Sequence, residues 1–450
     1  MVLGGLLFAQ QGAAGAETGW SLPRKIFQSP GQISTQAITV DTHGRVHAFW
    51  LAEDYGGVGQ SSSSLYYLRL DALTERAPVD ILGETGSIGG VTATTDGSDH
   101  VLVNVSGNRT LRAPAGQAGS VRAWSECGEG VAALFYGHVT VDLSGTAWVA
   151  YSGRDDFNIY VQKWQEAGWN DPIAISPPVF PNAAPDYARV AFDSKGTIHV
   201  VWSEYQLPAG WPPLGTLYSR SADGGASWSR PVEIAIGPYH QPALAVGPND
   251  DLHVLMNGMV GIGGRYYRRS SDGGQTWTRV SAIVPPGKGG SEHTPNLVVD
   301  AAGVAHVLTS YDNAAWYLAL YNGNWSAPEC VSCAPGVPRG HLEAPSMALG
   351  VGNLLHVLFW VDDTQLFYTT RTIGAPARAP LPLPTPAPTA IRLAPTAIAA
   401  LAPTRPPVAI NPVAPGEVSG VPAAQIVASI LAPLLAVCAF GLVFLVRRRQ

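Results

Sequence analysis

The stretch Asp193–Trp202, DSKGTIHVVW, joins a turn sequence to a strongly apolar segment. In the Asp-x-x-Gly part, an aspartate can accept backbone hydrogen bonds and a glycine tolerates a positive φ, so a tight turn is expected. The β-branched and aromatic residues that follow predict a strand. The same turn-plus-strand pattern recurs along the chain, which indicates a repeated structural unit.

Two more copies of this pattern are clear, DTHGRVHAFW from Asp41 and DAAGVAHVLT from Asp300. Four weaker copies are TTDGSDHVLV, DLSGTAWVAY, GPNDDLHVLM and GVGNLLHVLF. The anchor residues of the seven segments are His47, His100, Trp148, His199, His253, His306 and His356. From His47 to His356 the six intervals average about 51 residues, a period typical of β-propeller blades.

Each repeat unit reads as four short strands: an alternating segment, the turn and strong strand, a third strand, and a fourth after another tight turn. The last unit stops after its third strand, and residues 20–27, WSLPRKIF, look like a missing fourth strand. We therefore expect the N-terminal strand to complete the last blade and close the ring. The predicted fold is an all-β, seven-bladed propeller of four-stranded blades over residues 17–374, with six blades as the alternative.

The composition supports this fold and excludes one class of partner. The 50 Gly and 37 Pro among 450 residues argue against long helices. The net charge of -6 offers no basic stripe for phosphate groups, so nucleic acid is not expected as a partner.

The two ends of the chain predict export and membrane anchoring. Residues 1–16 resemble a signal peptide without its basic region, and residues 375–422 form a Pro/Ala/Thr-rich linker. Residues 423–446 are apolar for long enough to span a bilayer, and the basic tail 447–450 follows. We expect a single-pass protein of the cell membrane with the propeller outside and the C-terminus in the cytoplasm.

Cysteines and histidines give no reason to expect a metal or another cofactor. Cys330 and Cys333 form one CxxC, which fits a local disulfide or two free thiols, whereas zinc would need further ligands. The anchor histidines occupy equivalent positions in separate blades, so they cannot converge on one ion. We expect them to be structural.

Two octapeptides, SADGGASW (residues 221–228) and SSDGGQTW (residues 270–277), lie between the third and fourth strands of adjacent units. They resemble the Asp box of the sialidase, or BNR-repeat, propellers. The aspartates can accept backbone hydrogen bonds, the glycines permit positive φ, and the tryptophans can anchor the hairpin. We expect a structural role for Ser221, Asp223, Gly225, Trp228, Ser270, Asp272, Gly274 and Trp277.

The resemblance also implies where a ligand would bind: the face formed by the loops between second and third strands and by the connections between blades. The connections contribute Asp186, Tyr187, Tyr239, His240, Lys288, Glu292, His293, Arg339, His341 and Glu343. The other loops contribute Glu53, Asp54, Tyr55, Arg154, Asp155, Asp156, Glu204, Tyr205, Trp211, Tyr311, Asp312, Asp362 and Asp363. Aromatic and carboxylate side chains in this mixture suit sugars.

Sialidases use three arginines on the substrate carboxylate, a tyrosine nucleophile activated by a glutamate, and an aspartate as acid/base. Arg189 most resembles the family's first arginine, and Arg154 and Arg339 could complete the set. Nucleophile candidates are Tyr187, Tyr205 and Tyr311; base candidates are Glu204, Glu292 and Glu343; Asp186 is a further acidic candidate. The family's Ile-Pro after the arginine is absent, and seven units exceed the six blades of sialidases.

Three hypotheses stay open. The protein could bind glycans or another extracellular partner through its loops without hydrolysis. It could be a glycoside hydrolase, either an exo-α-sialidase or an enzyme with a carboxylate pair. It could be a structural or assembly protein without a small ligand.

Overall fold

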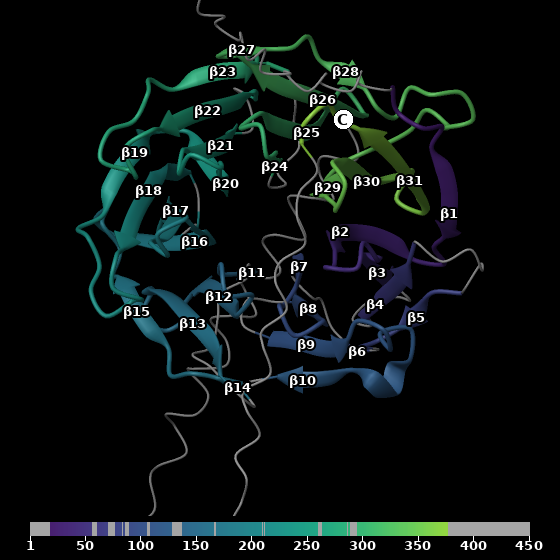
Figure 1. Ribbon diagram of the computed structural model, residues 1–450, viewed down its shortest axis with the longest axis horizontal. Coiled ribbons are helices and arrows are strands. Elements are labelled where there is room, and N and C mark those ends of the chain that lie inside the picture. Colours follow the sequence, from purple (N-terminus) through teal and green to yellow (C-terminus); the bar gives the residue numbers. More distant parts are fainter. Residues whose placement is uncertain are drawn as a thin grey trace, which may run out of the picture. The chain divides into compact units, whose positions relative to one another are not determined.

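The computed structural model describes residues 19–376 except 56–60, 71–76, 83, 86–89, 106–108, 128–136, 166–167, 209, 211, 260–262, 286 and 289–294. The described residues form seven antiparallel sheets, which follow one another in chain order around a central axis (Figure 1). The prediction of a seven-bladed, all-β propeller is confirmed.

The blades are numbered in chain order, and the strands of each are given from the axis outward. Blade 1 contains β2 (Gln32–Val40), β3 (Val46–Tyr55), β4 (Ser61–Arg69), β5 (Val79–Asp80) and β6 (Glu84–Thr85). Blade 2 contains β7 (Val91–Thr95), β8 (His100–Val105), β9 (Arg109–Pro114) and β10 (Ser125–Cys127), with a 3-10 turn at Val121–Ala123. Blade 3 contains β11 (His138–Val141), β12 (Ala147–Ser152), β13 (Ile159–Gln165), β14 (Gly168–Trp169) and β15 (Ile173–Ser176). Blade 4 contains β16 (Ala183–Phe192), β17 (Ile198–Gln206), β18 (Pro213–Ser221) and β19 (Val232–Ile236).

The remaining three blades follow the same plan. Blade 5 contains β20 (Tyr239–Val246), β21 (Leu252–Gly258), β22 (Arg265–Ser270) and β23 (Ser281–Val284). Blade 6 contains β24 (Asn296–Val299), β25 (Ala305–Tyr311), β26 (Ala314–Tyr321), β27 (Asn324–Trp325) and β28 (Glu329–Cys330). Blade 7 contains β29 (Ser346–Leu349), β30 (Leu354–Val361), β31 (Gln365–Thr372) and the N-terminal β1 (Arg24–Gln28).

Strand β1 closes the ring, as predicted. It pairs antiparallel with β31, where Arg24 lies opposite Tyr368. Just before it, Ser21 N donates to Thr370 O at 2.8 Å, and the Trp20 ring packs edge-on against Tyr317. The first and last parts of the propeller therefore share one blade and leave no open edge on β31.

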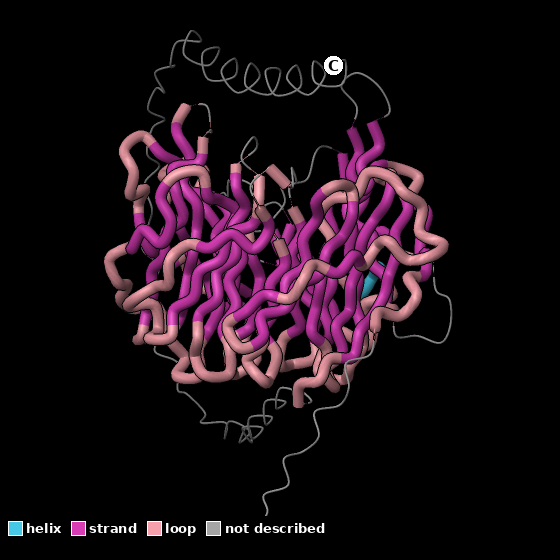
Figure 2. Tube along the Cα trace, turned by 90° about the horizontal axis from the view of Figure 1, so that it is seen from above, coloured by secondary structure: helices cyan, strands magenta, loops and turns pink. Residues whose placement is uncertain are grey.

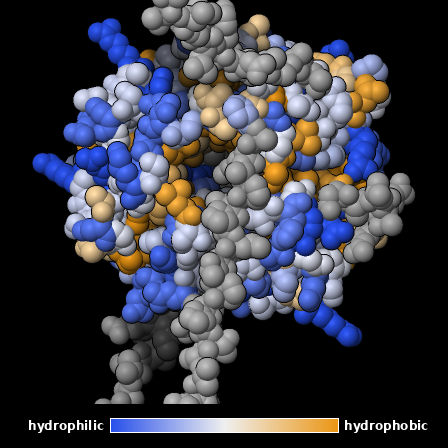
Figure 3. Space-filling view, in the orientation of Figure 1, coloured by the Kyte–Doolittle hydropathy of each residue, from blue (hydrophilic) through white to orange (hydrophobic). Residues whose placement is uncertain are grey.

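The strands run between two faces of the ring (Figure 2). We call the face with the turns between strands 1 and 2 and between strands 3 and 4 the turn face. The opposite face, with the loops between strands 2 and 3 and the connections between blades, is the loop face. One face of the ring is hollowed at its centre, and both apolar and polar residues border the hollow (Figure 3).

The turn between strands 1 and 2 is built alike in all seven blades. Its fourth residue always has a positive φ, which glycine, aspartate and asparagine tolerate best. The seven residues are Gly44, Asp99, Gly145, Gly196, Asp250, Gly303 and Asn353. This register corrects one anchor. In blade 2 the left-handed residue is Asp99 and not Gly97, so Leu102, and not His100, is equivalent to the anchor histidines.

The anchor histidines are buried structural groups, each paired within its own blade. In blade 1, His47 Nδ1 lies 2.8 Å from the Tyr67 hydroxyl and Nε2 lies 3.2 Å from Asp41 Oδ2. Blade 6 repeats this triad with His306, Tyr317 and Asp300. In blade 7 a glycine replaces the aspartate, and a Cβ at Gly350 would lie only 2.6 Å from His356 Nε2.

The two octapeptides form the same turn in blades 4 and 5. Asp223 Oδ1 accepts from Ser227 N at 2.9 Å, and Gly225 N donates to Ser221 Oγ at 2.8 Å. Asp272, Thr276, Gly274 and Ser270 repeat these bonds. The second turn also joins the two blades, because Gly273 O accepts from Tyr218 and Arg220 and the Trp277 ring packs against Tyr218.

The innermost strands are joined side to side by polar side chains. Thr92 Oγ1 donates to Gly137 O and accepts from Val139 N, which belong to the next blade. Asn296 does the same for Pro345 O and Met347 N at 2.7 and 3.0 Å. These bonds use backbone groups that the first strand of a sheet would otherwise leave unpaired at the axis.

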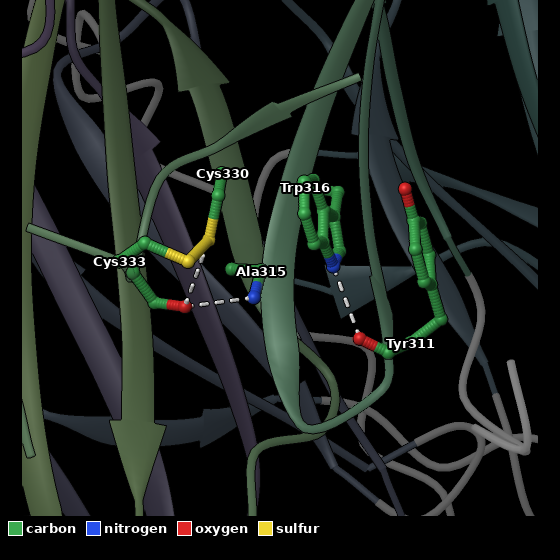
Figure 4. Close-up of a disulfide and its surroundings, with 6 residues drawn as sticks. Tyr311, Ala315, Trp316, Cys330 and Cys333 are labelled. Carbon is green, nitrogen blue, oxygen red and sulfur yellow. Dashed lines mark hydrogen bonds between the residues drawn. A yellow bond between two sulfur atoms is a disulfide. The ribbon is translucent and has the colours of Figure 1, made fainter. Parts of the chain in front are cut away.

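Cys330 and Cys333 form a disulfide at the outer edge of blade 6 (Figure 4). The residues between them bind β26: Val331 N donates to Ala315 O at 2.8 Å, and Ser332 Oγ accepts from Ala315 N at 3.0 Å. Of the two open alternatives for the CxxC, the structure has the disulfide.

The predicted segments 1–16, 423–446 and 447–450 lie outside the described residues, as does 375–422 beyond its first two residues. Within the described part of the chain, no helix is both long and apolar enough to cross a membrane.

Candidate functional site

The strongest cluster of candidate residues lies on the loop face, where blades 4 and 5 meet. Strand β16 has a register shift between Asp186 and Arg189, and Tyr187 within it has φ 56°. Tyr187 N donates to Asp186 Oδ1 at 2.7 Å. A bulky residue in the left-handed region is an outlier of the kind that gathers at functional sites.

Strand β20 of the next blade repeats this irregularity. Its register shifts between His240 and Ala243, and Gln241 has φ 48°. The Gln241 side chain is buried and accepts from Asn257 Nδ2 at 2.6 Å. Both inner strands therefore bend at the same level of the loop face.

Aromatic side chains connect the two bends. The rings of Tyr187 and Tyr205 are 6.1 Å apart, and the Tyr205 hydroxyl lies 3.3 Å from His240 Nδ1. His240 is 2% exposed, and burial lowers its pKa to about 4. The imidazole is therefore neutral at physiological pH. Tyr187 is the partly exposed member of this group, and Tyr205 and His240 lie buried behind it.

Arg189 lies two residues after Tyr187 and is buried next to blade 3. Its Nη1 donates to Ala188 O at 2.9 Å. The neighbouring His138 Nδ1 accepts from Val190 N at 3.3 Å. Burial, and then the charge of Arg189, lowers the pKa of His138 to about 3. Asp186, Tyr187 and Arg189 thus lie on the same strand, β16, with Tyr205 beside Tyr187 and with Arg189 next to His138 of blade 3.

Glu204 is separated from this group. Its carboxylate accepts from Val179 N and Phe180 N at 2.8 to 3.0 Å and from Trp202 Nε1 at 3.2 Å. Val179 and Phe180 belong to the connection from blade 3, whereas Tyr205 contacts His240 of blade 5, so Glu204 and Tyr205 face different blades. Burial raises the pKa of Glu204. Its observed role is to hold the turn at Val179, and it does not pair with Tyr205.

Arg154 and Arg339 do not join Arg189. Both are exposed, Arg154 in a loop of blade 3 and Arg339 in the connection between blades 6 and 7. Within the described ranges, neither guanidinium makes a hydrogen bond or ion pair. The described side chains therefore give no sign of a three-arginine cluster.

The other candidates are spread around the loop face. Tyr311 stacks on Trp316 with ring centroids 4.9 Å apart, and Lys288 Nζ donates to Asp312 at 2.8 Å. Tyr239 packs edge-on against Tyr266. Asp155 is exposed, Asp156 binds Asn158, and Glu53 is buried. His341, Glu343, Asp362 and Asp363 form a separate cluster at blade 7, described below. The side chains of Asp54, Tyr55, Trp211, Glu292 and His293 lie outside the described residues.

Sequence reasoning missed Arg265, which is 1% exposed and joins blades 5 and 6. Its guanidinium donates to Thr309 Oγ1, Gly264 O and Ser310 O at 2.7 to 3.0 Å. Burial lowers its pKa to about 10. No local motif marks this residue, because two of its three partners, Thr309 and Ser310, come from the neighbouring blade.

One group of possible metal ligands lies on the turn face: Asp41, His43 and Asp99. Arg45 donates to both carboxylates and already supplies a positive charge between them. The arrangement is therefore an ion-pair link between blades 1 and 2.

No protein-family model matches the chain, and no curated protein matches it. Solved structures do. An ulvan lyase of a polysaccharide lyase family, solved with -[GlcA(1-4)Rha3S]- bound, is 10% identical with a TM-score of 0.50, over 77% of this chain and 95% of that one. An α-L-arabinanase of Penicillium chrysogenum is 14% identical with a TM-score of 0.45, over 79% and 99%. The sialidase NanB is 12% identical with a TM-score of 0.44, over 77% and 70%. At these identities the likeness extends to the propeller fold and no further.

Proposed function

We propose that the loop face at blades 4 and 5 is a carbohydrate-binding site. The observation that carries this proposal is the conformation of Tyr187: a partly exposed aromatic residue with φ 56°, placed against Tyr205, which in turn contacts His240. Aromatic rings stack on the CH faces of sugars. Neutral polar groups such as backbone amides, phenols and imidazoles can form hydrogen bonds with sugar hydroxyls.

We also propose that the chain is an Asp-box propeller held at the outer surface of the cell membrane. The octapeptides at Ser221 and Ser270 support the first part, since their aspartates and glycines make the bonds that the motif needs. The apolar segment 423–446 and the arginines after it support the second. The ligand would then be an extracellular glycan.

Binding without hydrolysis is the first choice, because Glu204 faces away from Tyr205 and the three candidate arginines come from different parts of the ring. Glycoside hydrolysis is the second candidate. Asp186, Tyr187 and Arg189 lie within four positions of β16, so one strand segment carries a carboxylate, a phenol and a guanidinium.

The experiment is a glycan array probed with the full chain in detergent. Tyr187→Gly is the decisive variant, because glycine accepts the positive φ and only the ring is lost. We expect binding to fall about 5- to 30-fold, since an aromatic contact to a ligand contributes on the order of 1–2 kcal/mol. Lys195→Ala on the turn face is the matched control.

A parallel assay with a fluorogenic sialoside, and with other glycosides, separates the two candidates. Turnover that Arg189→Ala abolishes would make the protein a hydrolase. Array binding without turnover would support the binding module. If the protein shows neither binding nor turnover, a structural role remains and the proposal is overturned.

A further inference from the structure

The seam between blades 7 and 1, where the ring closes, is held by three segments that are far apart in the sequence. They are the link between β1 and β2, the connection from blade 6 to β29, and the turn between β30 and β31. Ser29 N donates to Thr364 O at 2.8 Å, Ile33 N to Asp363 O at 2.6 Å, and Asp362 N to His341 O at 2.8 Å. These backbone bonds place all three segments side by side on the loop face.

Side chains form a second set of links across the same seam. His341 Nδ1 lies 2.8 Å from Asp363 Oδ1, and His341 Nε2 lies 3.4 Å from Glu343 Oε1. Asp363 Oδ2 accepts from Gln32 Nε2 at 3.1 Å. The imidazole thus lies between two carboxylates, and one of them continues the link to blade 1.

The cluster is open to solvent, so its protons can exchange with the medium. The side chains of His341, Glu343 and Asp363 are 47%, 31% and 28% exposed. The imidazole also packs against the Trp360 ring at a centroid distance of 5.4 Å.

The described part of the chain places three further charged groups near this cluster. Asp362 Oδ1 accepts a hydrogen bond from His341 N at 3.1 Å, and the charge of Arg265 acts on Glu343. Glu53 on β3 lies opposite Gln32 of β2. Burial alone would lower the pKa of His341, but the bonds and charges of Asp363 and Glu343 outweigh burial and raise it.

The number of donors on the ring depends on its protonation. An imidazolium has two N–H groups and can donate to both carboxylates, whereas a neutral imidazole has one. Loss of the proton would remove the imidazole hydrogen bond to Asp363 Oδ1 or to Glu343 Oε1, and the two negative charges would no longer have a positive charge between them.

We propose that His341 is a protonation-dependent latch of ring closure, which holds the connection from blade 6 and the β30–β31 turn against blade 1 on the loop face. The protonated latch is closed. As the pH rises and the proton leaves, the seam opens locally while the backbone pairing of β1 with β31 stays in place. This inference does not depend on the proposed function.

His43 in the seam between blades 1 and 2 is the matched control. Its Nδ1 lies 3.2 Å from Asp99 Oδ1, and its side chain is 51% exposed, close to the value for His341. There, however, Arg45 donates to Asp99 and keeps its charge at every physiological pH. Loss of the His43 proton should therefore leave that seam unchanged.

The test is hydrogen–deuterium exchange by mass spectrometry on the full chain in detergent, expressed as protection factors so that the intrinsic pH effect is removed. Between pH 6 and pH 8.5 we expect protection of residues 29–33, 339–346 and 361–365 to fall at least about fivefold, as follows from loss of one charge-assisted hydrogen bond. His341→Gln should give the low protection at both pH values, and His43→Gln should match the unmodified chain.

Two further variants still test the proposal if His341→Gln folds poorly. His341→Lys keeps a positive charge through this range and should remove the pH dependence while retaining protection. Asp363→Asn should lower the midpoint of the His341 titration followed by NMR of labelled histidine. Equal protection at pH 6 and pH 8.5 in the unmodified chain, or an unchanged midpoint in Asp363→Asn, would overturn the latch.

Discussion

His253 Nδ1 lies 2.8 Å from the hydroxyl of Tyr267, and Gly247 occupies the position at which blades 1, 4 and 6 have the aspartate that faces the histidine. Burial lowers the pKa of His253 to about 4, and that of His356 in blade 7 likewise. Both rings are therefore neutral in the folded protein at pH 7.

This relationship predicts acid sensitivity. Between about pH 6.5 and pH 4 these histidines bind protons in the unfolded chain but stay neutral in the folded protein. The free energy of unfolding should therefore decrease as the pH falls through that window. Each histidine contributes a slope of up to about 1.4 kcal/mol per pH unit. Urea unfolding at pH 7 and pH 5 measures it. His253→Asn should reduce the pH dependence by one histidine's share; an unchanged slope in this variant would contradict the assignment.

A pair of glycines in the octapeptide turns tests the packing between blades 4 and 5. A Cβ at Gly274 would lie 2.1 Å from the Tyr218 hydroxyl, whereas a Cβ at Gly224 meets nothing within 4 Å, and both residues have positive φ. Gly224→Ala should cost only the backbone strain, about 1 kcal/mol, and Gly274→Ala at least about 2 kcal/mol more because the interface must shift. Urea unfolding compares the two, and similar losses would mean that Tyr218 moves freely.

The disulfide at the rim of blade 6 should make a modest contribution to stability. Cys330 and Cys333 are three positions apart, and closing so short a loop stabilises by about 2 kcal/mol at most. We expect Cys330→Ser/Cys333→Ser to lower the thermal midpoint by a few degrees. Reductant should lower the midpoint of the unmodified chain by the same amount and leave the variant unchanged.

Removal of residues 19–28 should expose the outer edge of β31. That strand now pairs with β1, and an unpaired edge recruits other strands. We expect the shortened protein to self-associate, as size-exclusion chromatography with light scattering would show. A monomer with unchanged exchange protection in β31 would mean that β1 is dispensable for closure.

The fold could be predicted because each blade repeats a local signal: a turn with one left-handed residue, followed by a buried strand. The same reasoning failed at His100, since Asp99 occupies the left-handed position that glycine marks in most other blades. Strand order alone also predicted that β1 would fill the vacant position in blade 7.

The candidate site was predictable only in part. Loop position brought Asp186, Tyr187, Tyr205 and His240 together on one face, and the structure places them at one seam. The sequence could not show that Glu204 and Tyr205 contact different neighbouring blades, nor that Arg265 donates to Thr309 of the next blade. Both depend on which blade lies against which side of a sheet.

The polar side chains at the axis make the order of the blades matter. Thr92 fits the backbone of blade 3, His138 that of blade 4, and Asn296 that of blade 7, each with its own shape and donor pattern. Exchange of two blades would therefore set mismatched partners against each other, although every blade has the same plan. A ring of identical units could be permuted freely, whereas the differing contacts of these blades fix their order.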